Sequence, residues 1–346
     1  MAETATAVDI HAHAVLGELF GAAGTEGPEA GRDAEGRPWV RVGDYVLRGV
    51  DYEGTAFMDP DLRIRQMDEM GIAVQVLSPN PLTYFYTLDP GPGINYCRLH
   101  NDLLAATVAR HPDRLRAFAT LPLQDLPAAV EELERAVSRL GMLGACIGTE
   151  FGTDLDNPAM DLLYQRAVEL DVPIFIHPAP TGLGRRPADG RLRRLDLDLL
   201  VGMPGEETLA IATLIFGGVL HRHPRLDVCI SHGGGAAAFL YGRLCHAART
   251  RPWSPGWLRT DGSFEELFHR LWFDCVVHDQ LSLDLLLRRA GEERVVLGTN
   301  FAGWDQEPVL ALGSLGPVLT ENARRLLRLD RRDRGGPFDG VAPPAM

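Results

Sequence analysis

The feature that most constrains the fold is a regular alternation of short apolar runs with amphipathic stretches along the 346 residues. Buried strands of a parallel sheet form short apolar runs, and the helices that connect them form amphipathic stretches. Eight runs fit the strand pattern: Ala7–His11, Ala73–Ser78, Leu115–Thr120, Gly144–Gly148, Pro173–His177, Leu226–Ser231, Leu271–Asp274 and Arg294–Gly298. The sequence therefore predicts an α/β fold with eight parallel strands.

The stretches between the runs show helical periodicity. In one of them Val130, Leu133 and Val137 recur three or four positions apart, which places them on one face of a helix. The predicted helices include Leu126–Leu140, Met160–Leu170, Glu206–Leu220, Ala236–Ala248 and Leu281–Ala290. Eight strands with intervening helices favour a closed (β/α)8 TIM barrel over an open doubly wound sheet, which also requires a glycine-rich phosphate turn after its first strand. No such turn follows the first run.

Two long stretches interrupt the alternation. Residues 17–57 contain two alternating segments around Gly43-Asp44, which predicts a small hairpin inserted after the first strand, over the barrel mouth. Pro178–Gly205 is predicted to be a long loop, a feature typical of lids and binding loops. The sequence thus predicts one domain over residues 1–329 and a disordered tail over residues 330–346.

The composition indicates which partners the protein can have and in which compartment it is expected. The formal net charge is −13, and an acidic chain repels a phosphate backbone, so we expect no nucleic acid partner. The five cysteines form no CxxC pair, which is typical of reduced thiols in a cytoplasmic protein. We find neither a signal-peptide pattern nor an apolar run near the ~20 residues of a membrane span, so we expect a cytoplasmic protein with no membrane partner.

Four histidines fall at the carboxyl ends of predicted strands. His11 and His13 are two residues apart at the end of the first run, so both side chains point to the same face. His177 ends the fifth run, and His232 follows the sixth. In a barrel these strand ends meet at the mouth that carries catalytic residues, and neutral imidazoles are metal ligands. The sequence therefore predicts a histidine cluster at one rim.

The remaining histidines divide into two groups. His278 follows the seventh run and is a candidate for lining the substrate pocket. The others lie in predicted helices or in the connections that precede strands, where surface or packing roles are expected: His100, His111, His221, His223, His246 and His269.

The sequence resembles the α-amino-β-carboxymuconate-ε-semialdehyde decarboxylase group of the amidohydrolase superfamily over nearly its whole length. The matching segments are Asp9–His13, Met58–Pro60 with Arg63 and Met67-Asp68, Val74–Val76, Leu121–Leu126, Ile176–Pro178, His232–Gly235, Phe239-Leu240 with Gly242-Arg243, and Arg294–Gly298. The HxH, His-Pro and His-Gly-Gly-Gly blocks are the specific ones.

The resemblance implies a set of site residues. It implies that His11, His13 and His177 hold one divalent metal, with zinc expected and manganese as the alternative. It implies that His232 is the acid/base residue. It further implies that Arg48 and Arg243 grip the substrate carboxylate, the second of them across the interface of a homodimer. A guanidinium matches a carboxylate through a two-bond fork, which suits such a clamp.

One residue departs from the pattern of that family. The family's eighth strand ends in Gly-Ser/Thr-Asp, and the aspartate is the last metal ligand, whereas this chain has Gly298-Thr299-Asn300. An asparagine can offer a carbonyl oxygen to a metal, but it brings no charge and takes up no proton. Asn300 is therefore a candidate metal ligand and a candidate catalytic residue, but without the charge of an aspartate. Asp305 and Glu150 are candidates to supply the missing carboxylate.

Three functions follow from these residues. The first is metal-dependent decarboxylation of a small unsaturated or aromatic carboxylic acid. The second is hydrolysis, hydration or cyclisation of a related unsaturated acid in the same site, with Asn300 marking the divergence. The third is a metal-free pseudoenzyme or binding protein. The four rim histidines favour the first two over the third.

Overall fold

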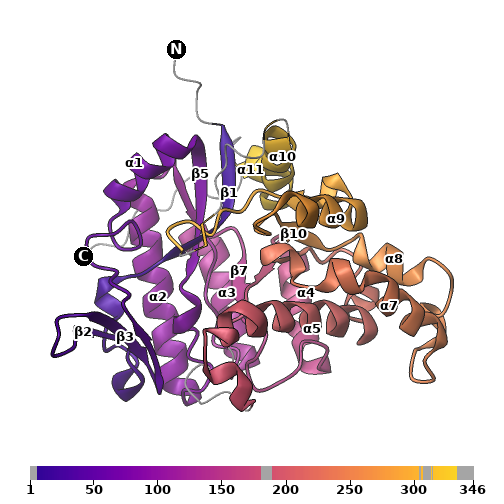
Figure 1. Ribbon diagram of the computed structural model, residues 1–346, viewed down its shortest axis with the longest axis horizontal. Coiled ribbons are helices and arrows are strands. Elements are labelled where there is room, and N and C mark those ends of the chain that lie inside the picture. Colours follow the sequence, from indigo (N-terminus) through magenta and orange to yellow (C-terminus); the bar gives the residue numbers. More distant parts are fainter. Residues whose placement is uncertain (1–5, 181–188, 304, 307–312, 314, 333–346) are drawn as a thin grey trace.

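A computed structural model describes residues 6–180, 189–303, 305–306, 313 and 315–332 (Figure 1). All eight predicted strands are present: β1 (Ala7–Ala14), β5 (Ile72–Pro79), β6 (Leu115–Ala117), β7 (Ala145–Ile147), β8 (Ile174–Ile176), β9 (Val228–Ile230), β10 (Trp272–Asp274) and β11 (Val295–Val296). Their pairings are parallel, in the orders β1-β5-β6 and β7-β8-β9-β10-β11. Parallel bridges between Ala119 and Ala145 and between Ala12 and Phe301 join the two sheets at both edges. The predicted TIM barrel is confirmed.

Helices cover the outside of the barrel. They are α1 (Pro60–Met70), α2 (Pro90–Arg110), α3 (Leu126–Leu140), α4 (Asp161–Glu169), α5 (Met203–Phe216), α6 (Val219–Arg222), α7 (Ala237–Thr250), α8 (Ser263–Phe268), α9 (Gln280–Ala290), α10 (Leu315–Leu327) and α11 (Leu329–Arg332). Asp59, Asp125 and Asp279 cap α1, α3 and α9 by accepting hydrogen bonds from backbone N–H groups of the first turn. The helix predicted over 206–220 is wrong at its end, because Gly218 takes a positive φ of 76° and separates α5 from α6.

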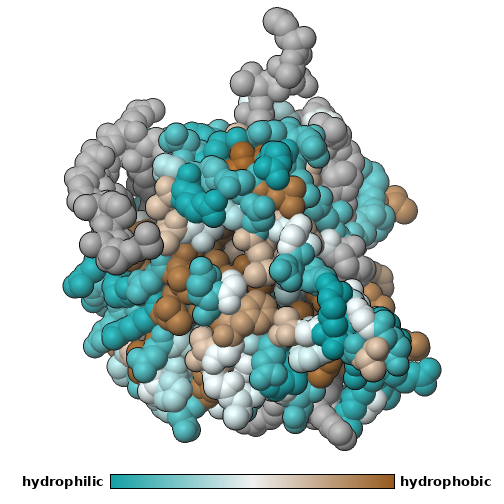
Figure 2. All heavy atoms as spheres, turned by 90° about the vertical axis from the view of Figure 1, so that its left-hand side faces the viewer, coloured by the Kyte–Doolittle hydropathy of each residue, from teal (hydrophilic) through white to brown (hydrophobic). Residues whose placement is uncertain are grey.

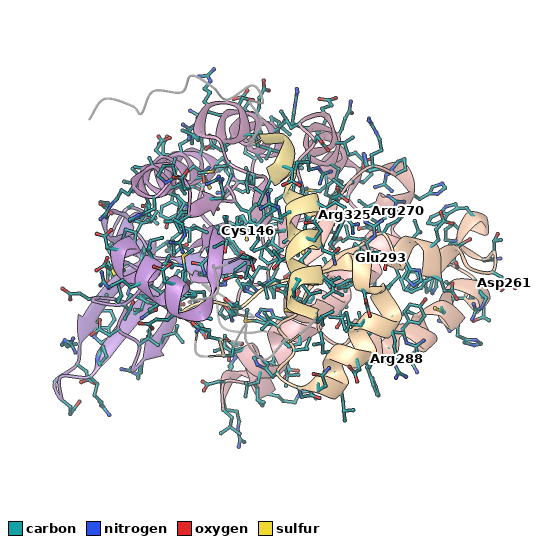
Figure 3. All side chains as sticks on the ribbon, turned by 90° about the horizontal axis from the view of Figure 1, so that it is seen from above. Cys146, Asp261, Arg270, Arg288, Glu293 and Arg325 are labelled. Carbon is teal, nitrogen blue, oxygen red and sulfur yellow. The ribbon has the colours of Figure 1, made fainter. Side chains whose placement is uncertain are left out.

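The barrel interior is a packed core. Inward-facing side chains of several strands, such as Ile10, Phe118 and Phe175, form one cluster with Leu326 and Leu327. Leu326 and Leu327 belong to α10, which lies beside the start of β1 in Figure 1 and crosses the middle of the molecule in Figure 3. This helix therefore closes the end of the barrel opposite the strand termini that carry the candidate site.

The segment after β1 forms the predicted hairpin and one further strand. β3 (Pro38–Val42) and β4 (Tyr45–Arg48) pair antiparallel around a turn at Gly43, where φ is 54°. β2 (Glu29–Arg32) pairs with β3, so the insertion is a three-stranded sheet, seen at the lower left of Figure 1. The Tyr45 hydroxyl donates to Asp198 at 2.9 Å and connects this sheet to the segment before α5.

That segment corrects the prediction of a plain loop over Pro178–Gly205. Residues 181–188 lie outside the described residues, but Gly190–Arg193 form a 3-10 helix and Asp198–Gly202 a π-helix that leads directly into α5. The π-helix and α5 together form 19 helical residues, long and apolar enough to cross a membrane by length and composition alone. This corrects the expectation that no segment nears that length. The segment carries the fully buried Glu207 and packs on other helices of the barrel.

The predicted disordered tail is only partly described. Asp330 and the two residues after it belong to α11, so the prediction of disorder is wrong for them. Residues 333–346 lie outside the described part of the chain.

A buried polar network ties β1 to its neighbours. Arg63 of α1 is 1% exposed; it donates to the His13 carbonyl and to Gln75 Oε1, both at 2.6 Å. Gln75 of β5 donates to Asp9 of β1 at 2.8 Å, and Thr299 donates to Asp9 from the segment after β11. Burial lowers the pKa of Arg63 to about 10, so its guanidinium stays charged at neutral pH.

We expect the substitution Arg63→Ala to lower the free energy of unfolding by about 3–5 kcal/mol, because it removes one member of a buried charged network and leaves the others unpaired. Urea unfolding followed by circular dichroism measures the change. Arg65→Ala, two residues along the same helix and exposed, is the control and should stay within about 0.5 kcal/mol of wild type. Equal stability of the two variants would contradict a structural role for Arg63.

Candidate metal centre and active site

The structure brings the three predicted ligand histidines together. The Nε2 atom of His13 lies 3.3 Å from Nε2 of His11 and 3.2 Å from Nε2 of His177. All three residues are buried, and their ligand nitrogens lie within 4.8 Å of one another. His11 and His13 project from the end of β1, and His177 follows β8, as the strand pattern predicts. Three converging imidazole nitrogens are a donor set for a divalent metal.

The second nitrogen of each ring is held by a fixed acceptor. His11 Nδ1 contacts Asp274 Oδ2 at 2.6 Å, His13 Nδ1 the Pro79 carbonyl at 3.1 Å, and His177 Nδ1 the Pro178 carbonyl at 2.7 Å. Carbonyls and carboxylates only accept, so each Nδ1 carries the hydrogen and each Nε2 keeps a free lone pair. Burial, together with neighbouring imidazoles, lowers the pKa of His13 and of His177 well below the ordinary value. Both rings are therefore neutral, as metal ligands must be.

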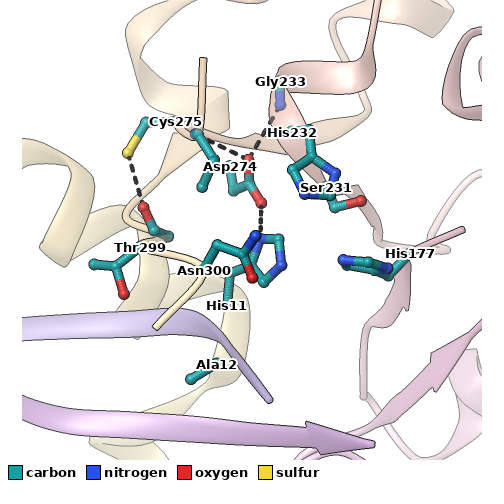
Figure 4. Close-up of polar contacts among 12 residues, drawn as sticks. His11, Ala12, His177, Ser231, His232, Gly233, Asp274, Cys275, Thr299 and Asn300 are labelled. Carbon is teal, nitrogen blue, oxygen red and sulfur yellow. Dashed lines mark hydrogen bonds and ion pairs between the residues drawn. The ribbon is translucent and has the colours of Figure 1, made fainter. Parts of the chain in front are cut away.

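Asp274 is a site residue that the sequence reasoning missed. It ends β10, is fully buried, and accepts from His11 and from the backbone N–H groups of Gly233 and Val276 (Figure 4). Burial alone would raise the pKa of Asp274, but these hydrogen bonds and the nearby His11 and His232 outweigh it and lower the pKa. Asp274 is thus a charged acceptor that orients His11. Its one sequence signal is an acidic residue at the end of an apolar run.

His232 stands beside the histidine cluster. Its ring centroid lies 4.9 Å from that of His177 and 5.0 Å from that of His11. His232 Nδ1 donates to Glu207 Oε1 at 2.6 Å, and the Ser231 hydroxyl donates to the same oxygen. Burial would lower the pKa of His232, but Glu207, with smaller contributions from two other carboxylates, outweighs burial and raises it to about 9. Glu207 thus favours the protonated form of the ring, which is the form that can donate a proton.

Glu207 is the second missed residue. It lies in α5 and is fully buried, a position that helical periodicity marks only as inward-facing. The glycines after His232 let this helix come close: a Cβ on Gly235 would lie 2.1 Å from the Pro204 carbonyl oxygen, and Gly235 has a φ of 61°. The close approach places Glu207 against His232.

Asn300 follows β11 at the same rim. It lines the same cavity as His13 and His177 and is drawn with the site histidines in Figure 4. It is 8% exposed, and its Nδ2 donates to Asp305 Oδ1 at 2.6 Å. Of the two carboxylates considered from sequence, Asp305 therefore adjoins the site. Glu150 is exposed, near Glu206, and does not belong to the described residues that line the cavity.

An open cavity of about 1680 Å³ lies above the histidines. His13, His177, His232 and Asn300 line it from the barrel; the hairpin and the residues before α5 line it from the sides. Its other side chains include Leu47, Tyr52, Phe57, Leu199 and Met203. Figure 2, which faces the side of the β2–β4 sheet, shows apolar side chains gathered in the middle of the face with hydrophilic ones around them. The cavity admits a ligand that is partly apolar.

The three predicted substrate contacts occupy different places. Arg48 of β4 is exposed and lines the cavity. His278 also lines it, and its Nε2 lies 3.6 Å from Asp305 Oδ2. Arg243 of α7 is exposed and is not among the described residues that line the cavity of its own chain. Arg193 and Arg194 line the cavity as well, although the sequence did not single them out.

Comparison with known proteins identifies the family of the chain. A family model described as Amidohydrolase matches residues 8–329. The chain is 35% identical over 245 residues to the 2-amino-3-carboxymuconate-6-semialdehyde decarboxylase of Dictyostelium discoideum; the match spans 70% of this chain and 66% of that enzyme, just under two thirds of its length. It is 31% identical over 291 residues to a gamma-resorcylate decarboxylase of Rhizobium radiobacter, spanning 79% of this chain and 88% of that one.

A solved structure shares the fold. The dihydroxybenzoic acid decarboxylase of Polaromonas sp. JS666, crystallised with manganese and the inhibitor 2-nitroresorcinol, superposes with a TM-score of 0.72. The two sequences are 22% identical, and the superposition covers 94% of this chain and 97% of the other.

The role of Asp274 can be tested directly. We expect Asp274→Ala to weaken the affinity of the histidine cluster for Zn²⁺ by about 10–100-fold, because His11 loses the charged acceptor that fixes its orientation. Competition with a chromophoric chelator measures the affinity. Asp261→Ala removes a carboxylate from the distant surface labelled in Figure 3 and should leave the affinity unchanged. If both variants bind Zn²⁺ like the wild type, Asp274 does not support the site.

Proposed function

Because the chain belongs to the amidohydrolase family, in the group that includes the 2-amino-3-carboxymuconate-6-semialdehyde and gamma-resorcylate decarboxylases, we propose that it is a metal-dependent decarboxylase of a small unsaturated or aromatic carboxylic acid. The observation that carries the proposal is the convergence of His11, His13 and His177, with His232 beside them, at one open cavity that His13, His177 and His232 line. The site thus combines a metal-binding donor set with a proton donor.

The donor set fits a catalytic metal. His11, His13 and His177 would hold it through Nε2, with the Asn300 carbonyl oxygen as the candidate fourth donor. Three protein imidazoles leave coordination positions open, as in catalytic rather than structural zinc sites. We propose zinc, with manganese as the alternative, since imidazole nitrogen suits zinc and a related decarboxylase binds manganese. When bound, the metal supplies Lewis-acid stabilisation of negative charge on the substrate.

The chain itself supplies the proton. In decarboxylation the bond between the substrate carbon and its carboxylate breaks, its electron pair stays on that carbon, and CO2 leaves. The imidazolium of His232 gives its proton to the same carbon, so a C–H bond replaces the C–C bond. Glu207 holds the ring in orientation and stabilises the imidazolium before transfer. Solvent reaches the open cavity and returns a proton to His232.

The arginines and apolar side chains that line the cavity can together bind an organic acid. Arg48 lines the cavity and can pair with a carboxylate in a two-bond fork. Leu47, Tyr52 and Phe57 offer apolar surface from the same side. A conjugated or aromatic acid meets both requirements, with its carboxylate held by charge and its ring packed against carbon.

The second clamp, Arg243, points to a homodimer. Arg243 lies four residues after Phe239 on α7, so both project from one face of that helix. Phe239 is 80% exposed, and Leu209 of the adjacent α5 is 61% exposed, so both helices present apolar side chains to solvent. We propose that this face contacts a second copy and that Arg243 reaches the cavity of that copy.

The state of the cysteines bears on the cellular compartment. The five cysteines are free and buried. Unpaired buried thiols support a reducing compartment, and we propose the cytoplasm.

The function is tested by metal content and CO2 release. Protein purified without added metal should contain near one zinc or manganese per chain by inductively coupled plasma mass spectrometry, and it should release CO2 from a panel of aromatic and unsaturated carboxylic acids. His232→Ala should keep the metal and lower turnover by about 10²–10⁴-fold, because the proton donor is lost. Full turnover of this variant would show that His232 is not the acid.

Other outcomes separate the alternatives. A product formed without CO2 favours a hydrolase, hydratase or cyclase. Ligand binding without turnover in a metal-free chain favours a binding protein. A chain that holds no metal and takes up none on titration contradicts the metal-dependent decarboxylase.

The dimer has its own test. Phe239→Glu should convert the protein to a monomer by light scattering after size exclusion, because a buried charge opposes association. Arg243→Ala should stay dimeric and raise KM for the acid. Leu162→Glu, at an exposed position on α4, is the control and should leave the mass unchanged. A wild-type chain that is already monomeric overturns the proposal for Arg243.

A further inference from the structure

The side-chain amide of Asn300 is fixed by one contact. Its Nδ2 donates to Asp305 Oδ1 at 2.6 Å. A carboxylate can only accept, so Asp305 must face the nitrogen end of the amide. This leaves Oδ1 as the atom of the amide that is available to a metal. The orientation of Asn300 is therefore decided by Asp305.

The backbone around Asn300 supports this arrangement. Asn300 has a φ of 48°, in the left-handed region that asparagine tolerates better than most residues. The Gly303 N–H donates to the Asn300 carbonyl at 2.8 Å and closes a tight turn from Asn300 to Gly303. A Cβ on Gly303 would lie 3.0 Å from Asn300 Oδ1, so the glycine leaves room for the amide. The turn brings Asp305 back onto the side chain of Asn300.

Asp305 has a second contact through its other oxygen. Its Oδ2 lies 3.6 Å from His278 Nε2, and the Asp305 side chain is 11% exposed. Asn300, Asp305 and His278 all line the cavity. The carboxylate thus bridges the amide beside the histidine cluster and an imidazole at the cavity surface.

From this geometry we propose that Asp305 is a positioning residue that holds the Asn300 amide with its oxygen available as a neutral metal ligand, and that the negative charge of Asp305 lies one hydrogen bond behind that ligand. The inference rests on the proposed metal site. A carboxylate in this outer position orients a ligand and raises its electron density, as the carboxylate partners of metal-binding histidines do. The pair Asn300–Asp305 divides between two residues what a single ligand aspartate supplies.

The experiment is a double-mutant cycle read out by metal binding. The variants are Asn300→Ala, Asp305→Ala and the combination of both, each measured for Zn²⁺ affinity by chelator competition and for the visible spectrum of the Co²⁺ form. We expect Asp305→Ala to weaken affinity by about 10–100-fold, like the loss of other outer partners. It should change the Co²⁺ spectrum in the direction of Asn300→Ala, and the double variant should bind no more weakly than Asn300→Ala.

Two further variants separate orientation from charge. Asp305→Asn keeps an acceptor for Asn300 and loses the charge, so it should retain more affinity than Asp305→Ala. Exchanging the pair, Asn300→Asp with Asp305→Asn, should bind Zn²⁺ more tightly than the wild type, because the charge then lies on the ligand itself. Asp44→Asn removes one charge from another residue that lines the cavity and is the matched control.

The outcomes distinguish the two proposals. If the wild type binds Zn²⁺ and His13→Ala abolishes binding, while Asp305→Ala binds like the wild type, the inference fails and the metal site stands. If Asp305→Ala and Asn300→Ala weaken binding additively, Asp305 acts on the metal independently of Asn300, which also overturns it. If the wild type binds no metal, the proposed function fails, and the inference fails with it.

Discussion

The position of the first strand is the constraint on which the site depends, and it is fixed by hydrogen bonds to Asp9. The Asp9 carboxylate, fully buried in β1, accepts from the backbone N–H of His11, from Gln75 of β5 and from both donors of Thr299 beyond β11. These contacts join the two strands that flank β1 on either side. A register shift of one residue would turn His11 and His13 away from the mouth, since side chains alternate along a strand. The hydrogen bonds of Asp9 therefore both close the barrel and orient the candidate metal ligands on β1.

The same network explains why the rim is polar while the barrel beneath it is apolar. Ile10 and Phe175 fill the interior one or two residues below the ligand histidines. Above them, each polar side chain has a partner of fixed direction: a backbone carbonyl for His13 and His177, and a carboxylate for His11. Buried polar groups without partners cost free energy, so the partners both stabilise the fold and set the tautomers.

The sequence predicts the residues that strand ends place, but not those that packing between elements places. Strand pattern and strand ends predict the barrel and bring His11, His13, His177 and His232 to one mouth, because the carboxyl ends of all the strands meet there. Asp274 and Glu207 escape such reasoning, since their contacts depend on the distances between elements. Glu207 reaches His232 only because α5 packs closely on the glycine turn. The helices within Pro178–Gly205 were missed for a similar reason: Asp198 is tied to Tyr45, a contact that local propensity does not contain.

The distribution of charge follows from Asn300. With three imidazoles and an amide, the candidate ligands carry no charge, whereas Asp274, Glu207 and Asp305 each lie one hydrogen bond behind a residue of the site. A neutral ligand set binds a divalent ion less tightly than one that includes a carboxylate, but it leaves more of the ionic charge to act on a bound acid. The surrounding carboxylates can limit the cost in affinity by orienting the candidate ligands. In the proposed metal site the ligands are therefore neutral, and the negative charge lies on the acceptors Asp274 and Asp305, which orient them.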